Sequence, residues 1–176
     1  DGRFVVAGSQ VRQKRLSDYA YFVMQEADHQ LYKESAVEEL RLGNERTSDI
    51  DERIAGILDM LNLTDFAQHH PYALSGGQKQ RLTIGTAMAS SKPIVVLDEP
   101  TSGLDWGNMC AVAQAINLLR ESERLVFVIT HDIELVDLTA TRVLALAEGR
   151  IADDFPLSSQ AALERTRQIM LGGGLL

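Results

Sequence analysis

The sequence predicts an α/β fold in which helices flank a mainly parallel sheet. Short, fully apolar segments alternate with segments of helical periodicity from residue 93 onward, and this alternation is typical of a parallel sheet with helices on both faces. A purely helical block at about residues 35–72 precedes that region, and we expect it to pack beside the sheet as an insert. At 176 residues, of which 45% are apolar, the chain is long enough to bury a core.

Two strands are expected near the N-terminus. Residues 3–7 predict a short strand that ends in a turn at Gly8, and residues 11–17 predict a solvated connection. Residues 19–24 combine aromatic and β-branched side chains and carry no charge, which predicts a buried strand. The polar residues 25–28 then predict a loop.

The helical block contains two expected helices. Residues 35–42 predict the first, and residues 43–47 break its pattern. Between residues 50 and 61 the isoleucines and leucines recur at helical spacing. Acidic residues stand at the start of this second helix, where they interact favourably with the positive end of the helix dipole. A turn at His70-Pro71 ends the block.

The remaining elements alternate along the chain. We expect helices at about 76–90, 109–119, 133–138 and 158–171, with Ser158 or Ser159 as the N-cap of the last. We expect strands at 94–97, 125–129 and 143–147, with a hairpin turn at 148–150. The glycines at 172–174 predict a frayed tail.

Composition excludes several classes of protein. The net charge of −8 argues against a domain that binds duplex nucleic acid, so no nucleic-acid partner is expected. The single cysteine, Cys110, forms no internal disulfide, which favours a reducing compartment. The sequence contains no apolar run near the ~20 residues that span a bilayer. If the protein acts at a membrane, other subunits must supply the spans.

Two carboxylates follow the apolar run at 94–97. Because ligands of open α/β sheets bind at the carboxyl ends of the strands, Asp98 and Glu99 would project into such a site. One acid can hold Mg²⁺ and the other can orient or deprotonate a water molecule. The alternative is a strand that simply ends in solvated acids.

A glycine-rich helix start precedes these acids. Ser75 is a good N-cap, and Gly76 and Gly77 leave backbone N–H groups uncovered ahead of Gln78. An anion can approach these groups at the positive end of the helix dipole. The alternative is an ordinary helix start. We refer to residues 75–78 as the helix tip.

Two more polar residues follow expected strands. His131 comes after the strand at 125–129, where it can donate a hydrogen bond to a phosphate. Gln25 follows the strand at 19–24, where its amide oxygen can coordinate a metal ion or water. Taken alone, each has a simpler interpretation. His131 would be a residue at the N-terminus of a helix, and Gln25 would be an ordinary loop glutamine.

The order of these features resembles the ATP-binding cassette (ABC) ATPases. Leu74 and the helix tip resemble the family's signature sequence, and residues 94–99 its Walker B strand. Residues 100–105 resemble its D-loop, His131 its switch histidine and Gln25 its Q-loop glutamine. The resemblance implies a P-loop NTPase-like α/β fold with an ABC-type helical subdomain. Residues 1–34 and 73–176 would form the core, and about 35–72 the helical subdomain.

The resemblance also implies roles. Asp98 and Gln25 would hold Mg²⁺, Glu99 would be the general base, and His131 would contact the γ-phosphate of ATP. The helix tip (Ser75, Gly76, Gly77 and Gln78) would bind ATP held by a second cassette, in a homo- or heterodimer, and Asp105 would lie across the same interface. An integral membrane subunit would be the other partner, which implies a peripheral location at the cytoplasmic face of the cell membrane.

Residues 24–32, Met-Gln-Glu-Ala-Asp-His-Gln-Leu-Tyr, are similar to the Q-loop region of energy-coupling factor transporters, which import vitamins and metal ions. That family usually has Asn-Pro or Asp-Pro where this chain has Glu26-Ala27. The resemblance implies the ATP-hydrolysing subunit of an importer. The alternatives are a soluble ABC ATPase and a non-hydrolysing cassette that donates only its signature sequence.

No Gly-x-x-x-x-Gly-Lys-Ser/Thr motif occurs in the sequence. In the ABC family this phosphate-binding loop, Walker A, lies upstream of the strand that contains Phe4. We therefore expect that the chain is a partial cassette, either truncated or one half of a tandem protein. Alone, it is expected to bind ATP poorly on its own face and to be inactive.

Overall fold

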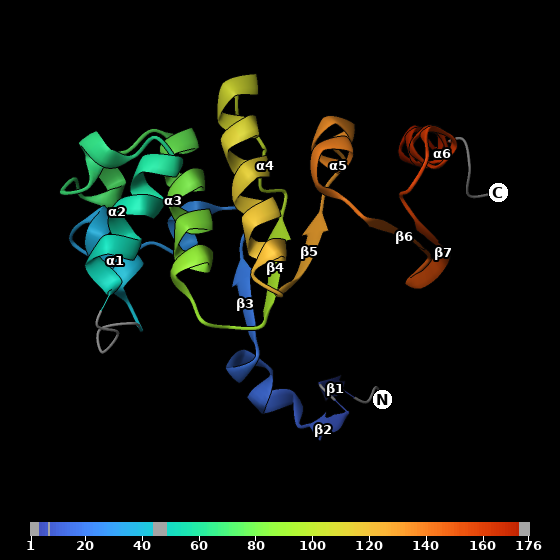
Figure 1. Cartoon of the computed structure of the whole chain (residues 1–176), viewed down its shortest axis with the longest axis horizontal. Helices are drawn as coiled ribbons and strands as arrows, with labels where there is room; N and C mark the ends of the chain where they lie inside the picture. The colour runs from blue at the N-terminus through green and yellow to red at the C-terminus, as the bar shows by residue number, and fades with distance from the viewer. Residues whose placement is uncertain (1–3, 7, 44–48, 173–176) are drawn as a thin grey trace. The chain divides into compact units, whose positions relative to one another are not determined.

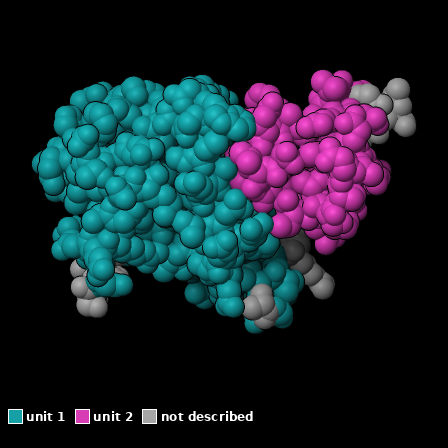
Figure 2. Space-filling view, turned by 45° about the horizontal axis from the view of Figure 1, so that its top comes forward, with its two compact units in different colours: residues 1–129 teal, residues 130–176 magenta. Residues whose placement is uncertain are grey.

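The computed structural model describes residues 4–6, 8–43 and 49–172 (Figure 1). The chain divides into two units, residues 1–129 and 130–176, which Figure 2 shows in different colours. Each unit is described by itself. The expected break at 43–47 and the glycine tail lie largely outside the described residues, as do Arg3 and Ala7 of the first expected strand.

The first unit begins with an antiparallel hairpin of β1 (Phe4–Val6) and β2 (Ser9–Val11). Gly8 makes the turn at φ +77°, a left-handed conformation that glycine adopts without steric cost. The expected solvated connection at 11–17 is confirmed for Arg12, Lys14, Arg15 and Ser17, which are exposed, but Val11 ends β2 and is buried, and η1 (Gln13–Asp18) is a 3₁₀ helix. The polar residues of this segment follow no strand or helix pattern, so neither β2 nor η1 was predicted.

Three parallel strands form the central sheet of the first unit, in the order β3 (Ala20–Val23), β4 (Ile94–Asp98) and β5 (Leu125–Ile129). All three are rich in β-branched or aromatic residues, which fit a pleated surface. The register aligns Val23 with Leu97 and Leu97 with Val128. All three strands therefore end at the same edge of the sheet.

One face of this sheet is buried and the other is exposed. Val23, Val95 and Leu97 are fully buried, on the face against which α3 (Gly76–Ala89) and α4 (Trp106–Glu121) pack. Phe22 and Phe127 point the opposite way and are 47% and 42% exposed. Within residues 1–129 as described, helices thus cover one face, whereas the sequence predicted helices on both and a fully buried strand at 19–24.

The segment between β3 and α3 is helical: the block expected at about 35–72 is confirmed, whereas the loop expected at 25–28 includes the start of a short 3₁₀ helix. The segment contains α1, α2 and three short 3₁₀ helices: α1 (Ala36–Arg41), α2 (Ile50–Met60), η2 (Ala27–His29), η3 (Thr64–Phe66) and η4 (Pro71–Ala73). Both α1 and α2 pack on α3. Gly85 of α3 makes this packing close, because a Cβ there would lie 2.9 Å from Leu40 Cδ2 and 3.1 Å from Ile57 Cγ2.

The second unit contains a hairpin and two helices. Strands β6 (Arg142–Ala147) and β7 (Arg150–Pro156) pair antiparallel, and helix α5 (Ile133–Thr139) packs on α6 (Gln160–Met170). Glu148 and Gly149 make the predicted turn with φ of +50° and +72°, the combination that suits a two-residue hairpin loop. Ser159 is the N-cap of α6, since its side chain accepts the N–H of Ala162 at 3.2 Å.

Candidate functional site

The carboxyl ends of β3 and β4 bring three of the predicted site residues to one edge of the sheet. Val23 pairs with Leu97, so Gln25 leaves β3 beside the end of β4, where Asp98 and Glu99 follow. Asp98 is half-buried and stands opposite Ile129 of β5, whereas Gln25 is exposed. This edge therefore offers two carboxylates and one amide oxygen, and oxygen donors of this kind suit Mg²⁺.

Glu99 has a backbone conformation that the sequence does not predict. Its φ is +47°, in the left-handed region that non-glycine residues seldom adopt. Two hydrogen bonds hold it there: its N–H donates to the Ile129 carbonyl at 2.9 Å, and its carbonyl accepts the Ser102 N–H at 3.2 Å. Such a conformation costs about 1–3 kcal/mol and occurs preferentially at functional sites. β4 ends at Asp98, directly before this residue.

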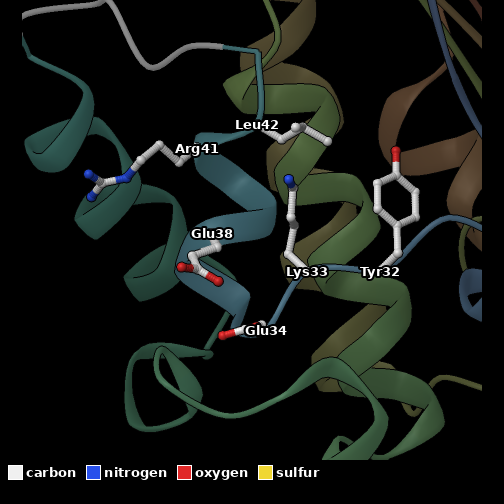
Figure 3. A pocket seen from close by; sticks show the side chains of 6 residues that line it. All are labelled: Tyr32, Lys33, Glu34, Glu38, Arg41 and Leu42. Atoms are coloured by element: carbon white, nitrogen blue, oxygen red, sulfur yellow. The ribbon is translucent and has the colours of Figure 1, made fainter.

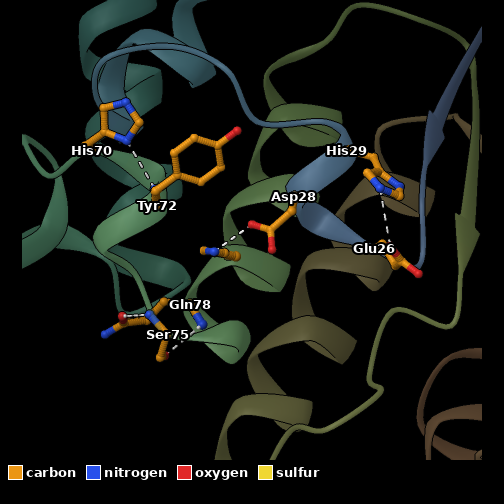
Figure 4. A network of polar contacts seen from close by, with 8 residues as sticks. Glu26, Asp28, His29, His70, Tyr72, Ser75 and Gln78 are labelled. Atoms are coloured by element: carbon orange, nitrogen blue, oxygen red, sulfur yellow. Dashed lines mark hydrogen bonds and ion pairs between the residues drawn. The ribbon is translucent and has the colours of Figure 1, made fainter.

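The helix tip is a capping box (Figure 4). The N–H of Gln78 donates to Ser75 Oγ at 3.4 Å, and the N–H of Ser75 donates to Gln78 Oε1 at 2.8 Å. Ser75 and Gly76 are exposed, and a Cβ on Gly76 would meet no atom within 4 Å. The structure thus exposes the start of α3, and it engages the Gln78 amide oxygen within the cap.

Gly77 serves a different purpose from Gly76. A Cβ on Gly77 would lie 3.1 Å from Leu104 Cδ2 and 3.7 Å from an Arg81 guanidinium nitrogen. Burial lowers the pKa of Arg81 from its ordinary value, and the negative charge of Asp105 opposes that shift. The helix tip and the loop that ends at Asp105 therefore lie side by side in the first unit.

Asp105 is the N-cap of α4. Its Oδ1 accepts the backbone N–H of Asn108 at 2.9 Å, and its Oδ2 accepts the Asn108 side-chain amide at 2.7 Å. The residue is exposed. Both of its oxygens are thus held in fixed directions at the surface, beside the helix tip.

His131 belongs to the second unit, so it is described apart from the residues above. It is exposed and lies directly before Asp132, the N-cap of α5. The Oδ1 of Asp132 accepts the N–H groups of Glu134 and Leu135 at 3.1 and 3.2 Å. The cap fixes the start of α5 and with it the backbone that presents His131.

The loop after Gln25 contains Gln30, a residue for which no role was predicted. The Oε1 of Gln30 accepts the Met24 N–H at 3.0 Å, and its Nε2 donates to the Phe22 carbonyl at 2.9 Å. The Gln30 side chain thus connects the end of the loop that contains Gln25 to the residues that precede Gln25, and these hydrogen bonds hold the loop closed. A glutamine in a polar stretch has no periodic signal, so only the folded chain reveals this role.

A pocket of about 530 Å³ lies beside this loop (Figure 3). Its six lining residues come from α1 and from the segments on either side of it: Tyr32, Lys33, Glu34, Glu38, Arg41 and Leu42. The buried carboxylate of Glu39 accepts the backbone N–H groups of Tyr32 and Lys33, which fixes the entry to α1. Tyr32 itself is 67% exposed, so the pocket offers an aromatic ring among charged side chains.

Relatives of known name match most of this chain. Two proteins from Treponema denticola, named ABC transporter ATP-binding proteins, are 39% and 40% identical over 148 and 149 residues. Each match covers 84% of this chain, and the chain spans about 30% of the length of either relative. A protein from Bacillus subtilis named as an HMP/thiamine import ATP-binding protein is 32% identical over 81% of this chain and 26% of its own length.

Solved structures share the fold. An ATP-binding cassette solved as a dimer in a post-hydrolysis state, bound to ADP and phosphate, has a TM-score of 0.76 and 27% identity over 90% of this chain and 75% of its own. A cassette from Clostridium perfringens, part of an ABC transporter complex, gives a TM-score of 0.74 over 95% of this chain and 70% of its own. These likenesses confirm the predicted P-loop NTPase-like α/β fold.

A family model described as ABC transporter matches residues 1–102 of the 176. The relatives carry the same description along most of the chain, and the solved cassettes supply the same fold. On these grounds the chain belongs to the ABC transporter family and has the fold of an ATP-binding cassette.

Proposed function

We propose that this chain is part of the ATP-binding and ATP-hydrolysing subunit of an ABC importer. The observation that carries the proposal is the sheet edge at which β3 and β4 end and which Gln25, Asp98 and Glu99 follow, with Glu99 held in a left-handed conformation. Family membership supports ATP as the substrate. In this proposal residues 1–34 and 73–176 belong to the α/β core, and about 35–72 to the helical subdomain.

Asp98 and Gln25 are the proposed holders of Mg²⁺. Their side chains supply a carboxylate and an amide oxygen from neighbouring parallel strands, a donor set that fits this ion. When bound, Mg²⁺ would neutralise charge that develops on the phosphates. Glu99 would accept the proton of the attacking water, and the two backbone hydrogen bonds at Glu99 would hold it in place for that step. His131 would donate a hydrogen bond to the γ-phosphate.

A second cassette is the proposed partner of the helix tip. Ser75 and Gly76 are exposed at the positive end of the 14-residue helix α3, where a phosphate is favourably bound. Asp105 stands beside the tip, so both would face the same partner. The dimeric state of a solved cassette supports this arrangement. ATP would then lie between the two cassettes, with Gln78 and Gly77 completing the tip.

An integral membrane subunit is the second proposed partner. In the residues that the structure describes, no helix is long and apolar enough to cross a bilayer. The pocket lined by Tyr32 and α1 follows the loop of Gln25 in the sequence, and we propose that a helix of the membrane subunit docks there, against Tyr32. Docking would place this chain, as a peripheral subunit, at the cytoplasmic face of the membrane. The name of the Bacillus subtilis relative, together with the Q-loop resemblance, supports an importer of the energy-coupling factor type.

The experiment is to purify the whole protein from detergent-solubilised membranes and to measure phosphate release from ATP with and without Mg²⁺. We expect Mg²⁺-dependent hydrolysis and an accompanying integral membrane protein. The matched variant Asp98→Asn removes the charge but keeps the shape, and we expect it to lose hydrolysis. Hydrolysis without a membrane partner would instead favour a soluble ABC ATPase, and a membrane partner without hydrolysis would favour a non-hydrolysing cassette.

A further inference from the structure

We infer that Lys79 is a positioning residue that connects the loop of residues 24–30, here called the Gln25 loop, to the helix tip. Lys79 Nζ lies 2.6 Å from Asp28 Oδ1. Figure 4 labels Asp28 and shows its ion pair as a dashed line. Asp28 belongs to η2, which follows Gln25 by two residues, and Lys79 directly follows Gln78 in α3. The pair therefore joins two proposed ATP-binding segments that are far apart in the sequence. The inference rests on the proposed function of these segments.

Lys79 is not an ordinary surface lysine. Its side chain is 15% exposed, and its Nζ lies 5.5 Å from the centre of the Tyr72 ring. The N–H of Tyr72 donates to His70 Nδ1 at 3.2 Å, which steadies the residue that carries the ring. Because the Lys79 side chain is mostly buried and so held in place, its ion pair loses less side-chain freedom than a pair formed by an exposed lysine does. Asp28 supplies the carboxylate partner from the Gln25 loop.

A second connection runs from the same loop to α3. Gln30 Nε2 donates to Tyr21 Oη at 3.4 Å, and the Tyr21 hydroxyl donates to Thr86 Oγ1 at 2.9 Å. The loop is thus fastened to α3 near its start, through Lys79, and two turns further along, through Thr86. Helix η2 also packs on α3.

The connections restrict how the two segments move. A displacement of the Gln25 loop along α3 must carry Lys79 with it or break the ion pair. Since Lys79 is one residue beyond the capping box, a displacement that carries it also moves the helix tip. The pair would keep the tip in the position that suits ATP held by a second cassette while Gln25 contacts the same reaction centre. Loss of the pair would weaken ATP binding across the interface more than the chemical step, because Glu99 is unaffected.

The test uses the whole protein and four variants: Lys79→Glu, Asp28→Lys, the double variant that exchanges the two charges, and Lys79→Arg. Lys79→Glu places two acids together, and we expect the KM for ATP to rise at least fivefold while kcat at saturating ATP stays within twofold. The charge exchange should return KM to within twofold of the wild type, and Lys79→Arg should behave as the wild type. Lys14→Glu, the same change at the exposed Lys14 of η1, is the control and should alter neither constant.

Backbone amide hydrogen exchange over residues 24–30 provides a readout that does not depend on catalysis. We expect at least tenfold faster exchange in Lys79→Glu, and recovery in the double variant. Three results would each overturn the inference. These are unchanged exchange in Lys79→Glu, a KM that the double variant does not restore, and faster exchange in Lys79→Glu with an unaltered KM. If the wild-type protein does not hydrolyse ATP, the proposed function fails, and the exchange data alone decide whether the pair fastens the loop.

Discussion

Gly85, in the middle of α3, provides the sharpest test of how α1 and α2 pack on that helix. A Cβ at this position would lie 2.9 Å from Leu40 Cδ2 and 3.1 Å from both Ile57 Cγ2 and Leu61 Cδ1. All three neighbours are buried, so the surrounding side chains have little room to withdraw. Gly85 is therefore required by packing, although glycine is a poor helix former.

Two opposing effects decide the outcome of Gly85→Ala. Alanine favours the helix over glycine by about 1 kcal/mol, whereas an additional carbon in a well-packed core costs about 1–3 kcal/mol. We expect a net loss of roughly 1 kcal/mol in the free energy of unfolding. Gly85→Val adds two more carbons and gains less helix propensity, so its loss should reach about 3 kcal/mol.

Gly56→Ala is the matched control. Gly56 lies on the exposed face of α2, and a Cβ there would meet no atom within 4 Å. The same substitution should therefore stabilise the protein by about 0.5–1 kcal/mol. Urea unfolding of the whole protein, followed by far-ultraviolet circular dichroism, measures all three variants. If Gly85→Ala stabilises the protein as much as Gly56→Ala does, α3 does not pack closely on α1 and α2.

Two further predictions concern polar groups. Glu39→Ala removes the acceptor of the Tyr32 and Lys33 N–H groups and should lower the free energy of unfolding by about 1–3 kcal/mol. Glu39→Gln keeps an acceptor, so it should lower the free energy of unfolding by less. Equal losses for the two variants in urea unfolding would contradict this role of Glu39. Arg142 hydrogen-bonds Asp154 and lowers the pKa of that carboxyl below its ordinary value of 3.8. The resulting stabilisation is present above pH 3.8 and is lost as the pH falls through the lowered value. Arg142→Met should therefore weaken the fall of the unfolding temperature in acid, and an identical fall in both proteins would argue against the pair.

The sequence predicts helix starts well, because caps are local signals. Ser35, Ser75 and Ser159 each precede a helix, and in each case the hydroxyl accepts a backbone N–H three residues later. The parallel strands β4 and β5 were also predicted, since apolar segments too short for a helix, placed between helices, are typical of the buried strands of an α/β fold. The fold class rests on these local patterns.

Features that depend on the folded chain were not predictable from local pattern. The left-handed conformation of Glu99 has no sequence signal, because glycine is the usual residue at such a φ. Phe22 looks like a buried strand residue, yet it is exposed, since burial depends on which elements cover that face of the sheet. The ion pair of Asp28 and Lys79 joins residues 51 positions apart, which no window along the chain detects.

The most direct test of the central proposal is ATP turnover by Glu99→Gln in the whole protein. Glutamine keeps the shape of the side chain but cannot accept the proton of water, so we expect ATP to bind, a dimer to accumulate and turnover to fall at least ~100-fold. Glu123→Gln is the control: Glu123 is also left-handed, at φ +60°, but it precedes β5, at the opposite edge of the sheet. Its turnover should equal that of the wild type. Undiminished hydrolysis by Glu99→Gln would contradict the assignment of Glu99 as the base.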